Sequence, residues 1–74
     1  MRELDIRRLL ERQPCPRMRL HLTNGLIFEI HDPDLVVLNR SVMELEFSSD
    51  QTREREAVIS LLHIIWIEVL PPVS

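Results

Sequence analysis

The stretch that most constrains the fold is residues 17–31, RMRLHLTNGLIFEIH, because its apolar alternation and its turn residues both predict a β-hairpin. The pair Asn24-Gly25 allows two connections. One is a two-residue type I′ turn, and the other is a three-residue loop over residues 23–25 with Gly25 in the left-handed conformation.

The side chains favour the three-residue loop. A two-residue turn would set Leu20 opposite Glu29 and mix charged and apolar side chains on both faces. The longer loop sets Arg19 opposite Glu29 and leaves the other face wholly apolar, through the pairs Met18–Ile30, Leu20–Phe28 and Leu22–Leu26. A one-residue shift in strand register would expose all of these apolar side chains to water. We therefore predict the three-residue loop with a G1-type bulge.

The chain has 74 residues and one cysteine. The length limits the number of domains, and the single cysteine indicates the cellular compartment. This length is near the lower limit at which one hydrophobic core stabilises a domain without disulfides or a bound metal. We therefore predict one domain over residues 1–74. A lone Cys15 cannot form an intrachain disulfide, which fits a reducing compartment, and we expect the cytoplasm. The longest apolar run, residues 57–70, is too short and too polar to span a membrane, and no signal-peptide pattern precedes the domain.

Residues 1–13 predict an amphipathic helix, since Ile6, Leu9, Leu10 and Gln13 recur at helical spacing. Salt bridges between residues three or four apart, such as Glu3 with Arg7, would support its outer face. Residues 14–16, Pro-Cys-Pro, cannot continue that helix and predict a stiff linker.

Short strands are predicted after the hairpin. Residues 35–38 are rich in β-branched side chains, and residues 41–47 alternate in polarity. Residues 48–56 predict a polar loop. Residues 57–70 could form a buried helix, but their β-branched content favours two short strands around a one-turn 3₁₀ corner at residues 60–63.

Several loose motifs together resemble one family. They are Glu11-Arg12-x-Pro14 before a strand, LHLTNG at residues 20–25, LVVL at residues 35–38 and a corner followed by a final strand within residues 58–67. This chain looks most like the bacterial Sm-like RNA chaperones of the Hfq type. The N-terminal half is also similar to short uncharacterised bacterial proteins that have a helix, a P-x-P link and an Asn-Gly or Asp-Gly hairpin.

The resemblance implies a mainly β fold in which an N-terminal helix packs on a small five-stranded antiparallel Sm-like or SH3-like barrel spanning residues 17–70. It also implies assembly into a ring, or failing that a dimer. This chain has Asp34 where the family has an Asn that holds a base, and Leu61 and Leu62 where the family has Lys and His.

The charge distribution gives one candidate RNA surface. Residues 1–31 hold six Arg against four acidic residues, although the whole chain has a net charge of −3. A phosphate-binding surface needs such a local cationic excess, but a dedicated nucleic-acid-binding domain is usually basic overall. We therefore expect weak RNA binding, through Arg7, Arg8, Arg12, Arg17 and Arg19.

The last strand predicts self-association. Residues 64–70 are apolar on both faces of the strand except at Glu68. A domain of this size has one core, which can cover only one of these two faces. Trp66 could anchor an interface or fill the core, and its apolar neighbours favour burial. An exposed apolar edge strand is usually covered or paired. We expect an oligomer interface made by Met43, Leu45, Ile65, Trp66, Ile67 and Val69.

No assembled active site is visible in the sequence. His21, His31 and His63 are not at metal-ligand spacing, and the chain has neither a Gly-x-Ser-x-Gly elbow nor a glycine-rich phosphate loop. We expect a non-enzymatic protein without metal, cofactor or small-molecule substrate. The alternative to weak RNA binding is a protein–protein interaction or scaffold module that binds no nucleic acid.

Overall fold

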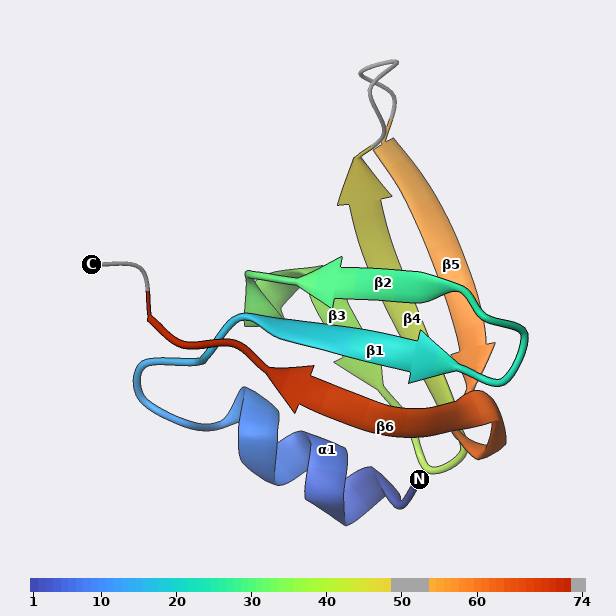
Figure 1. The fold of residues 1–74 in the computed structure, drawn as a ribbon, viewed down its shortest axis with the longest axis horizontal. Coiled ribbons are helices and arrows are strands. Elements are labelled where there is room, and N and C mark those ends of the chain that lie inside the picture. The colour runs from blue at the N-terminus through green and yellow to red at the C-terminus, as the bar shows by residue number, and fades with distance from the viewer. Residues whose placement is uncertain (49–53, 73–74) are drawn as a thin grey trace.

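A computed structural model describes residues 1–48 and 54–72 of the chain (Figure 1). The protein is mainly β with one N-terminal helix. Its elements are α1 (Glu3–Leu10), β1 (Met18–Leu22), β2 (Ile27–Ile30), the 3₁₀ turn η1 (Pro33–Leu35), β3 (Val36–Leu38), β4 (Val42–Ser48), β5 (Glu54–Ser60), the 3₁₀ turn η2 (Leu61–His63) and β6 (Ile64–Val69).

The strands form two antiparallel three-stranded sheets. Sheet A has the order β2-β1-β6, and sheet B has the order β3-β4-β5. In Figure 1 the strands of sheet A run across the front of the molecule, and the long β4–β5 pair crosses behind them and extends above β2. The helix α1 lies below β6 in the same view.

The prediction of a five-stranded closed barrel is wrong. Six strands are present, and within residues 1–48 and 54–72 no strand pairing joins sheet A to sheet B. The two 3₁₀ turns explain the separation, because η1 carries the chain from β2 into sheet B and η2 returns it to β6. Pro33 starts η1, and the Asp32 carboxylate accepts the Asp34 N–H at 2.9 Å, which ends β2 rather than letting it continue into sheet B.

The predicted hairpin register is confirmed. Leu20 pairs with Phe28 and Arg19 pairs with Glu29, as the three-residue loop requires. Gly25 has a φ of 87°, and its N–H donates to the Leu22 carbonyl at 3.0 Å. The apolar pattern therefore sets this register, since only this register turns Met18, Leu20, Leu22 and Ile30 into the core.

The prediction of two strands around a corner at residues 60–63 is also confirmed, because β5 and β6 flank η2. The expected polar loop over residues 48–56 is shorter than predicted, since β4 reaches Ser48 and β5 starts at Glu54. The centre of that expected loop, residues 49–53, lies outside the described residues.

The helix is shorter than the predicted residues 1–13 and ends at Leu10. It anchors through Ile6, which is buried in the core, and through Arg7. The Arg7 guanidinium lies 2.6 Å from the Glu3 carboxylate, which is the predicted pair one helical turn apart, and it also donates to the Leu38 carbonyl at 3.2 Å. These contacts attach α1 to the end of β3.

One apolar core fills the space between the two sheets and the helix. Its buried members come from every element of both sheets except β3, and from α1 and η2; they are Ile6, Met18, Leu20, Leu22, Ile30, Met43, Leu45, Ile59, Leu61 and Ile64. None of the helices in the described part of the chain is long and apolar enough to cross a membrane.

Candidate interaction surface

The outer face of sheet A carries two rows of side chains across its three strands. One row places Arg19 of β1 between Glu29 of β2 and Glu68 of β6. The next row places His21 between Ile27 and Trp66. We define the outer face of sheet A as these residues: Arg19, His21, Ile27, Glu29, Trp66 and Glu68.

The β1 and β6 side chains of this face form a connected group. The rings of His21 and Trp66 stack with centroids 4.1 Å apart and an interplanar angle of 12°. His21 Nε2 lies 3.2 Å from Glu68 Oε1, and Arg19 approaches the same oxygen at 3.8 Å. Because a carboxylate only accepts hydrogen bonds, Nε2 is the donating nitrogen of His21.

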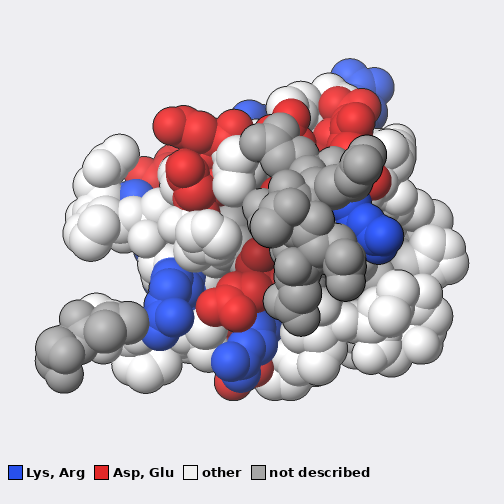
Figure 2. Space-filling view, turned by 90° about the horizontal axis from the view of Figure 1, so that it is seen from above, with Lys and Arg blue, Asp and Glu red and all other residues white. Residues whose placement is uncertain are grey.

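Charge pairing on the outer face differs in detail from the predicted Arg19–Glu29 pair. Those two residues are opposite each other, but Glu29 has its ion pair with Arg17 at 3.7 Å, while Arg19 has its own with Glu68. On the face drawn in Figure 2, basic and acidic side chains lie next to each other along the lower part of the view, and acidic ones predominate along the upper part. Each partly exposed pair contributes at most about 1 kcal/mol to stability.

The prediction that Trp66 is buried is wrong, since its side chain is 48% exposed. Trp66 lies beside His21 on the outer face, and a bulge separates it from the buried Ile64. His21 pairs with Trp66, but the next residue, Leu22, pairs with Ile64, so Ile65 is an extra residue on β6. The alternation of the strand shifts at that point, and Ile65 and Trp66 are both exposed while Ile64 is buried.

The residues predicted to form an oligomer interface lie in different places. Met43 and Leu45 are 0% and 1% exposed, so their side chains belong to the core between the sheets. Ile67 is half-buried and packs against that core. The exposed members of the predicted set are Ile65, Trp66 and Val69, all on β6.

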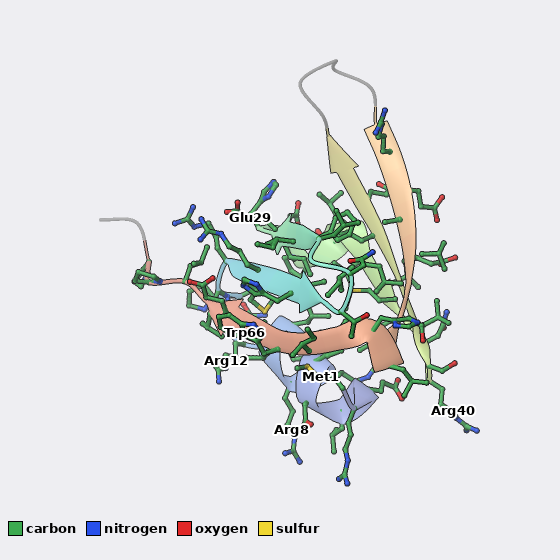
Figure 3. All side chains as sticks on the ribbon, turned by 45° about the vertical axis from the view of Figure 1, so that its right-hand side comes forward. Met1, Arg8, Arg12, Glu29, Arg40 and Trp66 are labelled. Carbon is green, nitrogen blue, oxygen red and sulfur yellow. The ribbon has the colours of Figure 1, made fainter. Side chains whose placement is uncertain are left out.

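The five arginines predicted to bind RNA do not gather in one patch. Arg7 is held by Glu3 and Leu38, and Arg17 and Arg19 are each paired with a carboxylate on sheet A. The remaining two, Arg8 and Arg12, are exposed and extend outward from the helical end of the molecule in Figure 3. The set is therefore divided between the helix and the outer face of sheet A.

Two hollows lie along β2, one on each side of Phe28, which lines both. The first, of about 390 Å³, is bounded by β2, η1 and β4 and contains Glu29, Asp32 and Glu46. The second, of about 400 Å³, is bounded by the hairpin loop, β5 and η2. Its apolar lining consists of Leu22, Leu26, Phe28, Ala57, Val58 and Ile59. The sequence pattern did not indicate these hollows, because they depend on how sheet B extends past β2.

The histidines have separate surroundings. His21 belongs to the stacked group on sheet A, whereas His63 Nδ1 lies 3.1 Å from the Thr23 hydroxyl. The Thr23 N–H also donates to the His63 carbonyl at 2.9 Å, so this pair connects the hairpin loop to η2. Among residues 1–48 and 54–72, no group of three or more His, Cys, Asp or Glu side chains is placed to hold a metal ion.

Cys15 lies in the linker, half-buried, with its Sγ 3.9 Å from the Leu9 carbonyl. Burial raises the pKa of this thiol, and the negative charge of Asp32 raises it further. A raised pKa disfavours the nucleophilic thiolate, so the surroundings of Cys15 do not activate it.

Comparisons with known proteins found no matching protein-family model, no matching curated protein and no matching solved structure. The resemblance to Sm-like proteins therefore stays a prediction, and the arguments that follow rest on the geometry of this chain alone.

Proposed function

We propose that this protein is a non-enzymatic interaction module whose copies associate through the outer face of sheet A. The observation that carries the proposal is the exposure of Ile65 and Trp66, 59% and 48%, next to the His21–Glu68–Arg19 group. Exposed aromatic and branched side chains with charged neighbours are typical of protein interfaces. A tryptophan that stacks on His21 and is still half exposed is a suitable anchor for such a contact.

The charges on this surface favour a second copy of the chain as the partner. Arg17, next to this surface, pairs with Glu29, and Arg19 pairs with Glu68, so the surface and its border carry both signs of charge. In a twofold dimer the same surface of each copy faces its counterpart on the other copy. A surface with both positive and negative charges can then place an arginine of one copy opposite a glutamate of the other. A single-sign patch would repel itself.

RNA binding is the weaker hypothesis for this surface. Of the five predicted arginines, three already have carboxylate or carbonyl partners. Phosphate contacts on Arg17 or Arg19 would have to replace those partners, and the adjacent Glu29 and Glu68 would repel the phosphates.

Size-exclusion chromatography with light scattering tests the proposal. We expect the mass of a dimer at high micromolar concentration and a monomer for Trp66→Glu, because the interface would then bury an unpaired charge. Ile65→Glu is a second variant in case Trp66→Glu disturbs the stack with His21. Leu62→Glu is the matched control, since Leu62 is 85% exposed on η2 and is not one of the residues of this surface, and it should leave the dimer intact.

Circular dichroism should show that each variant is folded. The proposal fails if the unmodified chain is a monomer at every concentration, or if Leu62→Glu dissociates the dimer as completely as Trp66→Glu does.

A further inference from the structure

The free edge of sheet A is formed by β2, which pairs with β1 on one side only. The Leu22 N–H donates to the Leu26 carbonyl, and hydrogen-bonded pairs alternate along an antiparallel ladder. The backbone groups of Phe28 and Ile30 therefore face β1, and those of Ile27 and Glu29 face outward. Within residues 1–48 and 54–72, the outward groups of Ile27 and Glu29 have no backbone partner.

The two hollows lie directly beside this edge. Both are lined by β2 on one side and by sheet B on the other, where β4 and β5 extend past β2 (Figure 1). Strands are about 4.8 Å apart in a sheet, so a further strand hydrogen-bonded to β2 would occupy the space over these hollows. It would also place side chains against the apolar wall of the second hollow.

The charges along the edge set the order of the side chains in an added antiparallel strand. The first hollow, at the C-terminal end of β2, is lined by three acidic residues, Glu29, Asp32 and Glu46, and by no arginine; Glu29 also forms an ion pair with Arg17. The second, at the hairpin end, is apolar with uncharged polar residues and His63 at its rim. A strand that runs antiparallel to β2, like its other neighbour β1, would meet the acidic hollow first and the apolar hollow afterwards.

We propose that β2 binds an extended peptide segment of a partner protein as a fourth strand of sheet A. The segment has a basic residue followed by alternating apolar residues. The basic side chain lies among Glu29, Asp32 and Glu46, and the apolar ones lie against Leu26 and Val58, which are 54% and 66% exposed. Backbone hydrogen bonds to the edge supply affinity, and the hollows select the side chains. This site uses the edge of sheet A; it shares Ile27 and Glu29 with the outer face of sheet A but does not include Ile65 or Trp66.

The test selects short random peptides displayed on phage against the full chain and then titrates the synthetic consensus peptide by fluorescence anisotropy. We expect an Arg or Lys followed by alternating apolar residues. Ile27→Pro should weaken binding about tenfold, because proline removes the outward N–H and yet is tolerated on an edge strand. Ile27→Thr is the matched control, since it shortens the same side chain and keeps the N–H.

Amide hydrogen exchange on the unmodified chain gives an independent measurement that does not depend on whether Ile27→Pro folds. The amides of Ile27 and Glu29 should exchange fast in the free protein and slowly with the peptide bound. The proposal is overturned if no peptide is enriched, if Ile27→Pro and Ile27→Thr bind alike, or if the protection appears away from β2. Trp66→Glu should still bind the peptide, which separates failure here from failure of self-association.

Discussion

His21 shows how several contacts within one sheet hold a histidine side chain. Its ring stacks on Trp66, its Nε2 meets Glu68, and its side chain is only 19% exposed. These contacts are made by β6, which lies more than forty residues along the chain from β1. The hairpin register puts His21 on the same face as Arg19, but the partners of His21 come from a strand that the local pattern does not specify.

Cys15 supports a prediction at the same scale. Partial burial and then the charge of Asp32 raise its pKa, so we expect its alkylation by iodoacetamide at neutral pH to be slower than that of an exposed cysteine. Asp32→Asn should lower the pKa and speed the reaction, because it removes the smaller of the two causes while an Asn oxygen can still accept the Asp34 N–H. Mass spectrometry of the alkylated chain over a pH series measures both rates.

The raised pKa of Cys15 also makes the stability of the folded protein depend on pH. The folded state binds the thiol proton more tightly than the unfolded state does, so this stabilisation is complete below the unfolded pKa. It is lost as pH rises through the folded value. An alkylation rate as fast as that of an activated thiolate, or a slower rate in Asp32→Asn, would contradict this assignment.

At the scale of elements, the β1–β2 hairpin depends on one backbone conformation. Gly25 adopts a φ of 87°, and a Cβ added there would meet no atom within 4 Å. Replacing Gly25 should therefore destabilise the protein only through the unfavourable positive φ, and not through a steric clash. We expect Gly25→Ala to lower the free energy of unfolding by about 1–2 kcal/mol, measured by urea denaturation.

Gly25→Asn is the control for that measurement, because asparagine tolerates the left-handed region better than alanine does and should cost less. An equal loss for Ala and Asn would mean that the cost comes from something other than φ. Unchanged stability in Gly25→Ala would mean that the loop adopts another conformation.

At the scale of the whole molecule, the separation of the strands into two sheets decides which surfaces the protein presents. The core between the sheets buries Met43 and Leu45, whereas Val58, Ile65 and Trp66 are left exposed. A closed barrel would have paired the edge that β2 leaves free. The open arrangement therefore creates both the edge and the hollows beside it.

RNA binding gives a prediction at this scale. We expect binding of uridine-rich and adenine-rich RNA to be weak in gel-shift titrations and to fall steeply with added salt, because exposed arginines would contact phosphates only. Asp34→Asn should strengthen any such binding slightly by removing a nearby negative charge. Tight binding that persists at high salt and is unchanged in Asp34→Asn would contradict this expectation and favour RNA as the partner.

The sequence by itself determined the features that depend on neighbouring residues. The hairpin register follows from the alternation around Gly25, the corner at Leu61–His63 follows from the branched residues on both sides of it, and the Glu3–Arg7 pair follows from helical spacing. Each of these is decided by periodicity and turn chemistry within a short stretch of chain.

Only the tertiary structure decided how the strands combine. The open edge of β2, the split of the arginines between α1 and sheet A, and the exposure of Trp66 all depend on contacts between segments far apart in the chain. The bulge at Ile65 lies where β6 pairs with β1 directly after η2, and the alternation within residues 64–70 does not indicate it. A local pattern tells which side chains share a face, but the three-dimensional packing determines which face is covered.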